Sequence, residues 1–152
     1  MGVKTQGTEL FFIYNSLSVK LLCPTGVTGL GGATDQIDTT CLGDSERTYV
    51  SGLANPGTVS VPFNFEPSAV SQQNLFTLKE TGAITNWIIC LSDGTAQPTV
   101  LTGNFVAPTG RTSAKFTAYV SDVNIDVSTN EIVRGTLTLQ RSGAVAWTFK
   151  TV

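Results

Sequence analysis

Acidic side chains at short spacings are the first place to look for catalytic chemistry in this sequence. Asp122 and Asp126 stand four residues apart, which places both carboxylates on one face of a strand, as a paired general acid and base would require. No neighbouring residue indicates a cleft or a perturbed pKa, so solvated charges flanking a bend are the favoured interpretation. Asp35 and Asp38 stand three apart, on opposite faces of a strand, and make a poor pair.

Histidine is absent from all 152 residues. Its absence removes Ser-His-Asp and Cys-His catalysis, most zinc and iron sites, and the commonest general base. The run "GLGG" at 29–32 lacks the GK[ST] ending of a phosphate-binding loop and any clear helix after it, so it indicates a flexible loop. We therefore expect no enzymatic activity, no metal and no cofactor.

The three cysteines, Cys23, Cys41 and Cys90, are an odd number without a CxxC spacing. A metal site would need histidine or closely spaced cysteines as well. Buried free thiols in a reducing compartment are therefore the favoured interpretation.

Charged residues are scarce, at 13% of the chain against about 25% in ordinary soluble domains. A surface built mostly of Thr, Ser, Asn, Gln and Gly has little electrostatic protection against self-association, which suits a protein whose purpose is to self-associate. The net charge of -2 and the pI of about 4.9 argue against a nucleic-acid-binding protein, which would carry a basic stripe for the phosphates.

The length suits one domain spanning residues 1–152, with enough chain for a full core. The sequence contains no apolar run of about 20 residues that would cross a membrane, and no basic-then-apolar leader with a small-residue cleavage site. We therefore expect a protein made and kept in a cytoplasm, without a membrane partner.

Turn signals recur at short intervals between runs rich in Val, Ile, Thr and Phe, which predicts a mainly β fold. Residues 10–22 predict one or two strands around a turn at "YNSL". Residues 58–65 form the clearest strand, because apolar and polar residues alternate along it. Its apolar face carries Val59, Val61, Phe63 and Phe65, and its polar face carries Thr58, Ser60 and Asn64. Pro62 cannot donate to a ladder, so this strand should lie at an edge or carry a bulge.

One helix is expected after this strand, with Ser68 as its N-cap and Gly82 at its C-terminal end. Asp93-Gly94 predicts a hairpin between "WIICL" and a strand over 100–106. Apolar residues occupy even positions up to Val120 and odd positions from Val123, which predicts a bulge at Ser121-Asp122.

Two further strand-like segments follow the bulge. Leu137 and Leu139 are in phase in the strand that closes the domain, and the alternating tail "AWTFKTV" is apolar enough to need a partner. Trp87 and Trp147 are expected in the core or at an interface, because nothing places them together on an exposed stacking surface.

Residues 42–56 are predicted to be a long loop without a core of its own, an unusual connection in a compact domain. If this loop docks on another copy of the chain, its apolar residues would be the anchors and its charged residues would be the polar rim that fixes register. The anchors are Tyr49, Val50 and Leu53, and the rim is Asp44, Glu46 and Arg47.

The order of these parts resembles the major tail tube proteins of long-tailed bacteriophages. The resemblance covers residues 34–143 and lies in the run "IDTTCLGDSERTYVSGLANPGTVSVPFNFEP", the short helix, the "DGT" turn, the "VLTGNFV" strand and the final alternating strands. It implies two packed antiparallel sheets in a sandwich or barrel-like arrangement, one short flanking helix and a long protruding loop that reaches a neighbouring subunit or ring.

The resemblance also implies a function. Six copies would close into a ring, and stacked rings would form a tube whose lumen conducts the viral genome, with DNA only as a passing, non-specific cargo. Partners would be further copies, the tape measure, the tail terminator and the tail tip, and the protein would be assembled in the host cytoplasm into the virion tail. Thr58, Ser60 and Asn64 are candidates to line the lumen.

Two other functions remain open at this point. One is the related tube protein of a bacterial secretion or injection device. The other is a monomeric β-barrel that binds a small ligand, for which an apolar cavity and a stable monomer would be the signs. An enzyme ranks behind both.

Overall fold

The computed structural model describes residues 2–22, 24–129 and 131–151. In this part of the chain the fold is mainly β, with several antiparallel sheets and one short helix, as the sequence predicts. The elements in chain order are β1 (Glu9–Tyr14), β2 (Leu17–Lys20), β3 (Thr34–Asp38), β4 (Tyr49–Ala54), β5 (Thr58–Asn64), α1 (Val70–Thr81), β6 (Thr85–Cys90), β7 (Thr99–Leu101), β8 (Asn104–Val106), β9 (Ser113–Asp126), β10 (Arg134–Arg141) and β11 (Ala146–Thr148).

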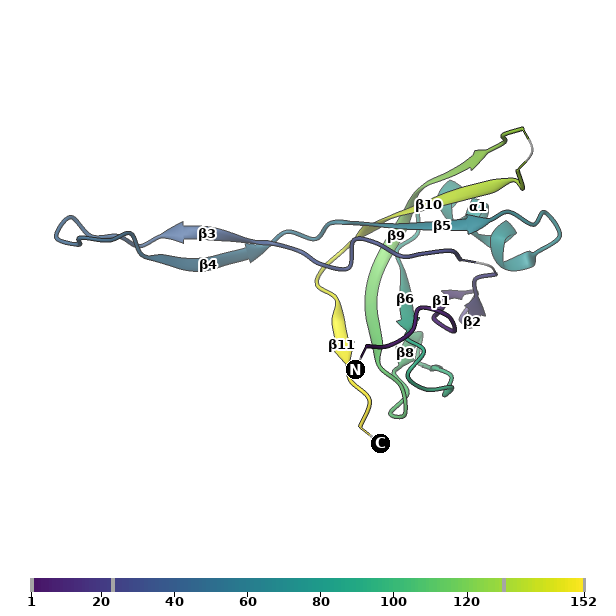
Figure 1. Cartoon of the computed structure of the whole chain (residues 1–152), viewed down its shortest axis with the longest axis horizontal. Coiled ribbons are helices and arrows are strands. Elements are labelled where there is room, and N and C mark those ends of the chain that lie inside the picture. Colours follow the sequence, from purple (N-terminus) through teal and green to yellow (C-terminus); the bar gives the residue numbers. More distant parts are fainter. Residues whose placement is uncertain (1, 23, 130, 152) are drawn as a thin grey trace.

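The main sheet has the strand order β2-β1-β6-β9-β10-β5, and β11 pairs with the first part of β9. Strand β9 is 14 residues long and curves through the middle of the molecule (Figure 1). Its first half pairs with β6 and its second half with β10. Thr138 lies opposite Asp122 while Leu139 lies opposite Val120, so Ser121 is the extra residue of a bulge and the predicted bulge is confirmed.

The core shows how the two halves of this sheet face each other. One buried cluster joins Phe12 and Trp87 of one half to Val61 and Leu137 of the other, and α1 adds Leu75. The rings of Phe12 and Trp87 lie 4.9 Å apart, and the Trp87 indole donates a hydrogen bond to the Ala118 carbonyl at 3.3 Å. The two packed layers are therefore halves of one bent sheet that share β9.

Two further features of the main sheet are the hairpin between β1 and β2 and the edge strand β5, which contains Pro62. Asn15 and Ser16 both have positive φ, at 51° and 62°, which is the type I′ turn expected between β1 and β2. Strand β5 is the last strand of its side, and Thr25 donates its N–H to the Pro62 carbonyl at 2.8 Å across the outer edge. The proline therefore lies at an edge, where its missing donor removes no bond to β10.

Helix α1 begins one residue later than predicted. Its N-cap is Ala69, without a side-chain cap, because the Ala69 N–H bonds to the Glu66 carbonyl at 3.0 Å in a preceding turn. Ser68 as the N-cap is therefore wrong. Gly82 ends the helix in the left-handed conformation, with φ 65°, and donates to the Leu78 carbonyl, which confirms the predicted stop.

The predicted hairpin at Asp93-Gly94 is wrong. Strand β6 pairs with β1 and β9, and the Asp93 carboxylate instead accepts hydrogen bonds from the Thr112 N–H and hydroxyl, at 2.9 and 2.6 Å. The hairpin lies at Thr102-Gly103, with φ of 50° and 80°, and divides the predicted strand into β7 and β8. This hairpin covers a second apolar cluster on the far face of the sheet: Phe11, Ile13, Ile88, Cys90 and Phe105.

The two tryptophans have different environments. Trp87 is buried in the core, whereas Trp147 in β11 is 44% exposed and stacks with Phe149 at a centroid distance of 6.5 Å. The tail finds a partner within the chain, since β11 pairs with residues 113–115 of β9. In the described residues no helix has the length and apolarity to cross a membrane.

Candidate functional site

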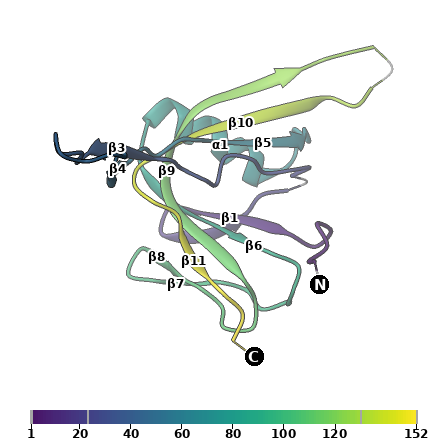
Figure 2. The same ribbon diagram turned by 60° about the vertical axis from the view of Figure 1, so that its left-hand side comes forward.

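The most unusual feature of the molecule is an arm formed by residues 34–54. Among the described residues, strands β3 and β4 pair only with each other, in a two-stranded sheet that projects far from the body (Figures 1 and 2). The prediction that 42–56 protrudes is supported by this geometry, but its description as an irregular loop is wrong, because residues 49–54 form β4. Val50 lies opposite Ile37, and the register shifts between Thr34 and Gln36, where the second strand carries an extra residue.

The tip of the arm, residues 39–48, is closed by its own hydrogen bonds. The Thr39 N–H donates to the Thr48 carbonyl at 2.9 Å, and the Thr48 N–H donates to the Thr40 hydroxyl at 2.9 Å. The Asp44 carboxylate accepts from the Cys41 N–H at 2.7 Å, and the Cys41 carbonyl accepts from the Asp44 N–H at 3.0 Å. The tip is therefore an ordered turn structure, although no body covers it.

A second acidic group supports the start of this tip. Asp38 accepts a hydrogen bond from the Thr40 N–H at 2.9 Å. Hydrogen bonds from the side chain and backbone of Thr40 hold the pKa of Asp38 below its ordinary value of 3.8. Asp38 therefore stays ionised at neutral pH and acts as a local turn-forming acceptor.

The apolar side chains of the arm are exposed on both of its faces. Ile37 and Val50 form a cross-strand pair and share one face, while Tyr49 lies on the other. Leu53 is 84% exposed, and Leu42 at the tip is fully exposed. A two-stranded ribbon is marginally stable alone in water. The arm can bury this apolar surface only against another molecule.

The structure thus brings the six predicted contact residues onto one projecting element. Asp44, Glu46 and Arg47 lie in the tip, and Tyr49, Val50 and Leu53 lie on β4. The sequence analysis missed two further exposed apolar residues, Ile37 and Leu42. Ile37 is the one apolar residue in the strand-like run "TDQID", and this is the signal that would have identified it as a facing partner of β4.

The polar side of β5 continues across its neighbours. Thr58, Ser60 and Asn64 alternate with buried Val59, Val61 and Phe63. In the ladder Ser60 lies beside Thr138 and then Asp122, and Asn64 lies beside Arg134 and then Asp126. The result is one polar face across three strands, with two carboxylates and one guanidinium in these rows.

The carboxylate pair Asp122 and Asp126 belongs to this face. Asp122 forms an exposed ion pair with Lys79 at 3.3 Å, and Asp126 accepts a hydrogen bond from Asn124 at 3.2 Å. Both groups therefore have ordinary local partners, in agreement with the interpretation as charges flanking a bend.

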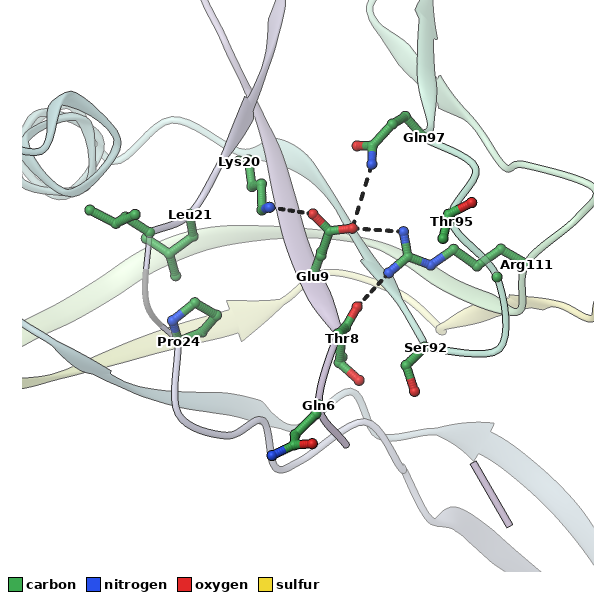
Figure 3. A pocket seen from close by; sticks show the side chains of 13 residues that line it. Gln6, Thr8, Glu9, Lys20, Leu21, Pro24, Ser92, Thr95, Gln97 and Arg111 are labelled. Carbon is green, nitrogen blue, oxygen red and sulfur yellow. Dashed lines mark hydrogen bonds and ion pairs between the residues drawn. The ribbon is translucent and has the colours of Figure 1, made fainter. Parts of the chain in front are cut away.

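A buried arginine organises the opposite end of the body. Arg111 is 1% exposed and lies beside Glu9 and Lys20 in a pocket of about 680 Å³ (Figure 3). Its guanidinium donates to Glu9 at 2.8 Å and to the Gly7 carbonyl at 2.7 Å, and it also donates to the carbonyls of Cys90, Leu91 and Ala96. Every donor nitrogen is engaged, so this cluster joins the N-terminal segment to the sheet and leaves no free group for chemistry.

The thiols differ from one another. Burial raises the pKa of Cys90 to about 11, which keeps this thiol protonated and unreactive at neutral pH. Cys41 is exposed at the tip of the arm, so the expectation of a buried thiol is wrong there. Cys23 lies outside the described residues. Within those residues no group of three or more potential metal ligands lies together.

Comparisons with known proteins agree with this architecture. A family model described as phage tail tube, lambda-like, matches residues 1–151. "Structural protein 3" of Pseudomonas phage PAJU2 is 34% identical over 148 residues, covering 93% of this chain and 90% of that protein.

Two solved structures share the fold at low sequence identity. The tail of an empty GTA particle matches at 10% identity with a TM-score of 0.70, covering 97% of this chain and 99% of that one. The SPP1 tail tube matches at 9% identity with a TM-score of 0.66, covering 99% of this chain and 81% of that one. The chain belongs to the lambda-like phage tail tube family and is a tail tube subunit.

Proposed function

We propose that this tail tube subunit closes into rings of six copies, that the rings stack into a tube, and that the lumen conducts the viral genome during ejection. The observation that carries the proposal is the arm, whose apolar side chains are not covered by any described part of their own chain. The matched tail of the GTA particle has C6 symmetry, which supports the number of copies. The low charge of the chain also suits self-association.

The arm is the joint between copies in this proposal. Tyr49, Val50 and Leu53 insert into an apolar surface of a neighbouring subunit or ring, and Asp44, Glu46 and Arg47 fix the register around them. Each buried aromatic or leucine anchor contributes about 2 kcal/mol to its contact. Repetition around a ring multiplies this contribution, so the loss of two anchors from every copy prevents assembly.

The polar face that runs from β5 to β9 is proposed to line the lumen, with Thr58, Ser60 and Asn64 on it. Duplex DNA must slide through the tube, and each cation fixed on a phosphate would add a salt-dependent contact that slows the passage. Hydroxyl and amide groups with a slight excess of carboxylate avoid that contact. DNA is therefore a passing cargo and not a bound partner.

The further partners proposed are the tape measure inside the tube, the tail terminator at one end and the tail tip at the other, with assembly in the host cytoplasm. Support for a terminator contact comes from the fold alone: the sheath/tube terminator structure of an extracellular contractile injection system matches at 12% identity with a TM-score of 0.70. The proposed role is structural and not enzymatic.

A tube protein of a bacterial injection device is the second candidate. The sheath-tube complex of the same type of injection system matches at 13% identity with a TM-score of 0.69, so the fold alone does not separate the two functions. The phage relative at 34% identity favours the virion tail.

Electron microscopy and light scattering of the purified full chain test the proposal. The wild type should form rings or tubes, and a Tyr49→Ser, Leu53→Ser double variant should remain a folded monomer with unchanged circular dichroism. Val70→Ser is the matched control, because Val70 is an exposed apolar residue at the start of α1. A wild type that stays monomeric at high concentration with a nucleating partner, or a double variant that builds tubes of normal length, contradicts the proposal.

A further inference from the structure

A second pocket lies where the arm joins the body. It has a volume of about 440 Å³ and is formed by the segment before β3, the end of β4 and the connection from β10 to β11. Its walls are mostly apolar or glycine, and include Leu30, Ala54, Pro56, Val145 and Trp147. Arg141 is the one ionisable side chain among the described residues that line it.

Arg141 is 4% exposed, and its Nε has no hydrogen-bond acceptor. Its Nη2 donates to the Gly31 carbonyl, and no carboxylate of the described residues lies within ion-pairing distance of the guanidinium. Arginine cannot release its proton at any ordinary pH, so the charge is present and largely desolvated. A buried charge is unfavourable unless it is paired and hydrogen-bonded.

The surrounding chain is shaped to hold this guanidinium. A Cβ atom added at Gly32 would lie 3.0 Å from Nη2 and 3.0 Å from the Asn55 carbonyl oxygen, so the backbone at Gly32 approaches the guanidinium closely and a side chain there would crowd it. Arg111 is also buried, at 1% exposed, but it has Glu9 as its counterion, whereas Arg141 has no counterion among the described residues.

We propose that Arg141 binds a carboxylate of a second copy of this chain, and that this carboxylate is Glu46 at the tip of the partner's arm. The inference rests on the proposed function, because it needs copies to assemble through the arm. A single guanidinium among apolar walls suits one singly charged carboxylate, to which arginine donates through two parallel N–H groups.

Glu46 is selected by the hydrogen bonds of the other acids on the arm. Asp35 accepts from Asn55 at 2.8 Å, Asp38 accepts from Thr40, and Asp44 accepts from Cys41. Glu46 has no hydrogen bond or ion pair within residues 2–22, 24–129 and 131–151, and it is exposed. Glu46 belongs to the connection between β3 and β4, which Figure 1 shows at the end of the arm far from the body, whereas Arg141 ends β10 in the body. The two residues of one chain therefore cannot meet.

The tip of the arm and the pocket around Arg141 also each carry an exposed apolar side chain. Leu42 at the tip is fully exposed, and Trp147 at the edge of the pocket is 44% exposed. A tip seated in the pocket would bury both. Each copy then offers one arm and accepts one, a heterologous contact that closes a ring or propagates from ring to ring according to its rotation.

Photo-crosslinking gives the first test. A benzophenone amino acid in place of Ser45, next to Glu46, is activated in assembled tubes and the products are mapped by mass spectrometry. We expect cross-links between copies to peptides containing residues 30–32, 54–56 or 141–147. Tubes whose cross-links lie only elsewhere overturn this inference, whereas a chain that neither assembles nor cross-links contradicts the proposed function.

Substitutions give the second test. Glu46→Gln should reduce assembly at least tenfold, measured as the critical concentration by light scattering, and Glu46→Arg should abolish it. Glu80→Gln on α1 is the matched control, since Glu80 is also an exposed carboxylate. Glu46→Gln that assembles like the wild type overturns the inference, whether or not any arginine variant folds.

A double-variant comparison connects the two residues. Arg141→Met should keep the melting temperature of the monomer, because it removes a buried unpaired charge, and it should lose assembly. Glu46→Leu alone should also lose assembly, but Glu46→Leu with Arg141→Met should recover part of it, because an apolar tip suits an apolar pocket. Additive losses in the double variant would show that the two residues do not meet.

Discussion

The Arg111 guanidinium donates to the Glu9 carboxylate at 2.8 Å, although the two residues are 102 positions apart in the sequence. Glu9 also pairs with Lys20 on the neighbouring strand. The cluster therefore connects β1, β2, the N-terminal segment and the chain before β9 (Figure 3). The buried guanidinium of Arg111 thus has a carboxylate counterion, whereas that of Arg141 has none among the described residues.

Arg111→Met should destabilise the subunit by about 3 kcal/mol, because removal of one partner leaves buried acceptors unpaired. The affected acceptors include the carbonyls of Gly7 and Cys90. The free energy of unfolding in urea measures the effect. Lys4→Met, at an exposed position, is the control, and equal stability of the two variants would show that the cluster contributes nothing.

The stability contributed by Glu9 should depend on pH. Burial alone would raise its pKa, but hydrogen bonds and charges from Lys20 and Arg111 outweigh burial and hold the pKa below its ordinary value of 4.5. A folded-state pKa below the unfolded value means that the contribution is complete above about pH 4.5 and is lost as the pH falls through the folded value.

The measurement compares the wild type with Glu9→Gln by urea unfolding between pH 7 and acid pH. The difference in unfolding free energy should be largest at neutral pH and should shrink below pH 4.5. A difference that stays constant over this range would show that the ionised form of Glu9 is not the stabilising one.

Most strands could be predicted from the local sequence, because apolar and polar residues alternate along them and the apolar ones are buried in the core of the same chain. The phase change around Ser121 predicts the bulge for this reason: Val120 and Val123 must both reach one core. Strand β4 was missed because Gly52 interrupts its pattern and its apolar residues face solvent. Its only strand partner in the part of the chain that the structure describes is β3, which is itself exposed.

Long-range contacts explain the other differences. Asp93-Gly94 has the composition of a hairpin turn, but Thr112 provides the partner that fixes Asp93. The unpaired state of Arg141 depends on the positions of Gly31, Gly32 and Asn55, which lie far from it in sequence. No local pattern around "LQRSG" indicates that this arginine is buried.

Cys41 should react quickly with a maleimide in the monomer, whereas Cys90 should react only after unfolding. The first thiol is exposed, and burial raises the pKa of the second to about 11, so it provides little thiolate. Mass spectrometry of a Cys23→Ser variant counts the labels. In assembled tubes the label on Cys41 should decrease strongly, since the tip of the arm is then covered. Equal labelling of monomer and tube would contradict docking of the tip.

Gly135→Ala should destabilise the body by about 1 to 3 kcal/mol through overpacking. A Cβ atom at this position would lie 2.5 Å from the Phe63 ring and 3.0 Å from Ile125. Gly43→Ala is the matched control, because an added Cβ at the tip of the arm meets no atom within 4 Å. Thermal unfolding of both variants measures the difference, and an unchanged melting temperature for Gly135→Ala would show that the core yields there.

Assembled wild-type tubes should bind duplex DNA weakly, and lysines on the proposed lumen face should create binding. Thr58→Lys, Ser60→Lys and Asn64→Lys add three cations, which lie opposite Gln140, Thr138 and Arg134 in the ladder with β10. Each phosphate that they neutralise releases counterions and contributes about -0.9 to the slope of log affinity against log salt concentration. Tubes of the triple variant, assembled around a short duplex, should therefore retain it at low salt and release it steeply as salt is added.

The matched control places three lysines at exposed positions outside this polar face. Two of them replace Gln73 and Thr81 in α1, and the third replaces Thr151 after β11. If the face from β5 to β9 lines the lumen, the enclosed duplex should meet only the first set of lysines, and co-sedimentation of DNA should separate the two variants. Equal retention by both variants would mean that DNA binds the outside of the tube. Micromolar, salt-dependent binding by the wild type would show that the lumen grips its cargo, and the polar face would then need a different role.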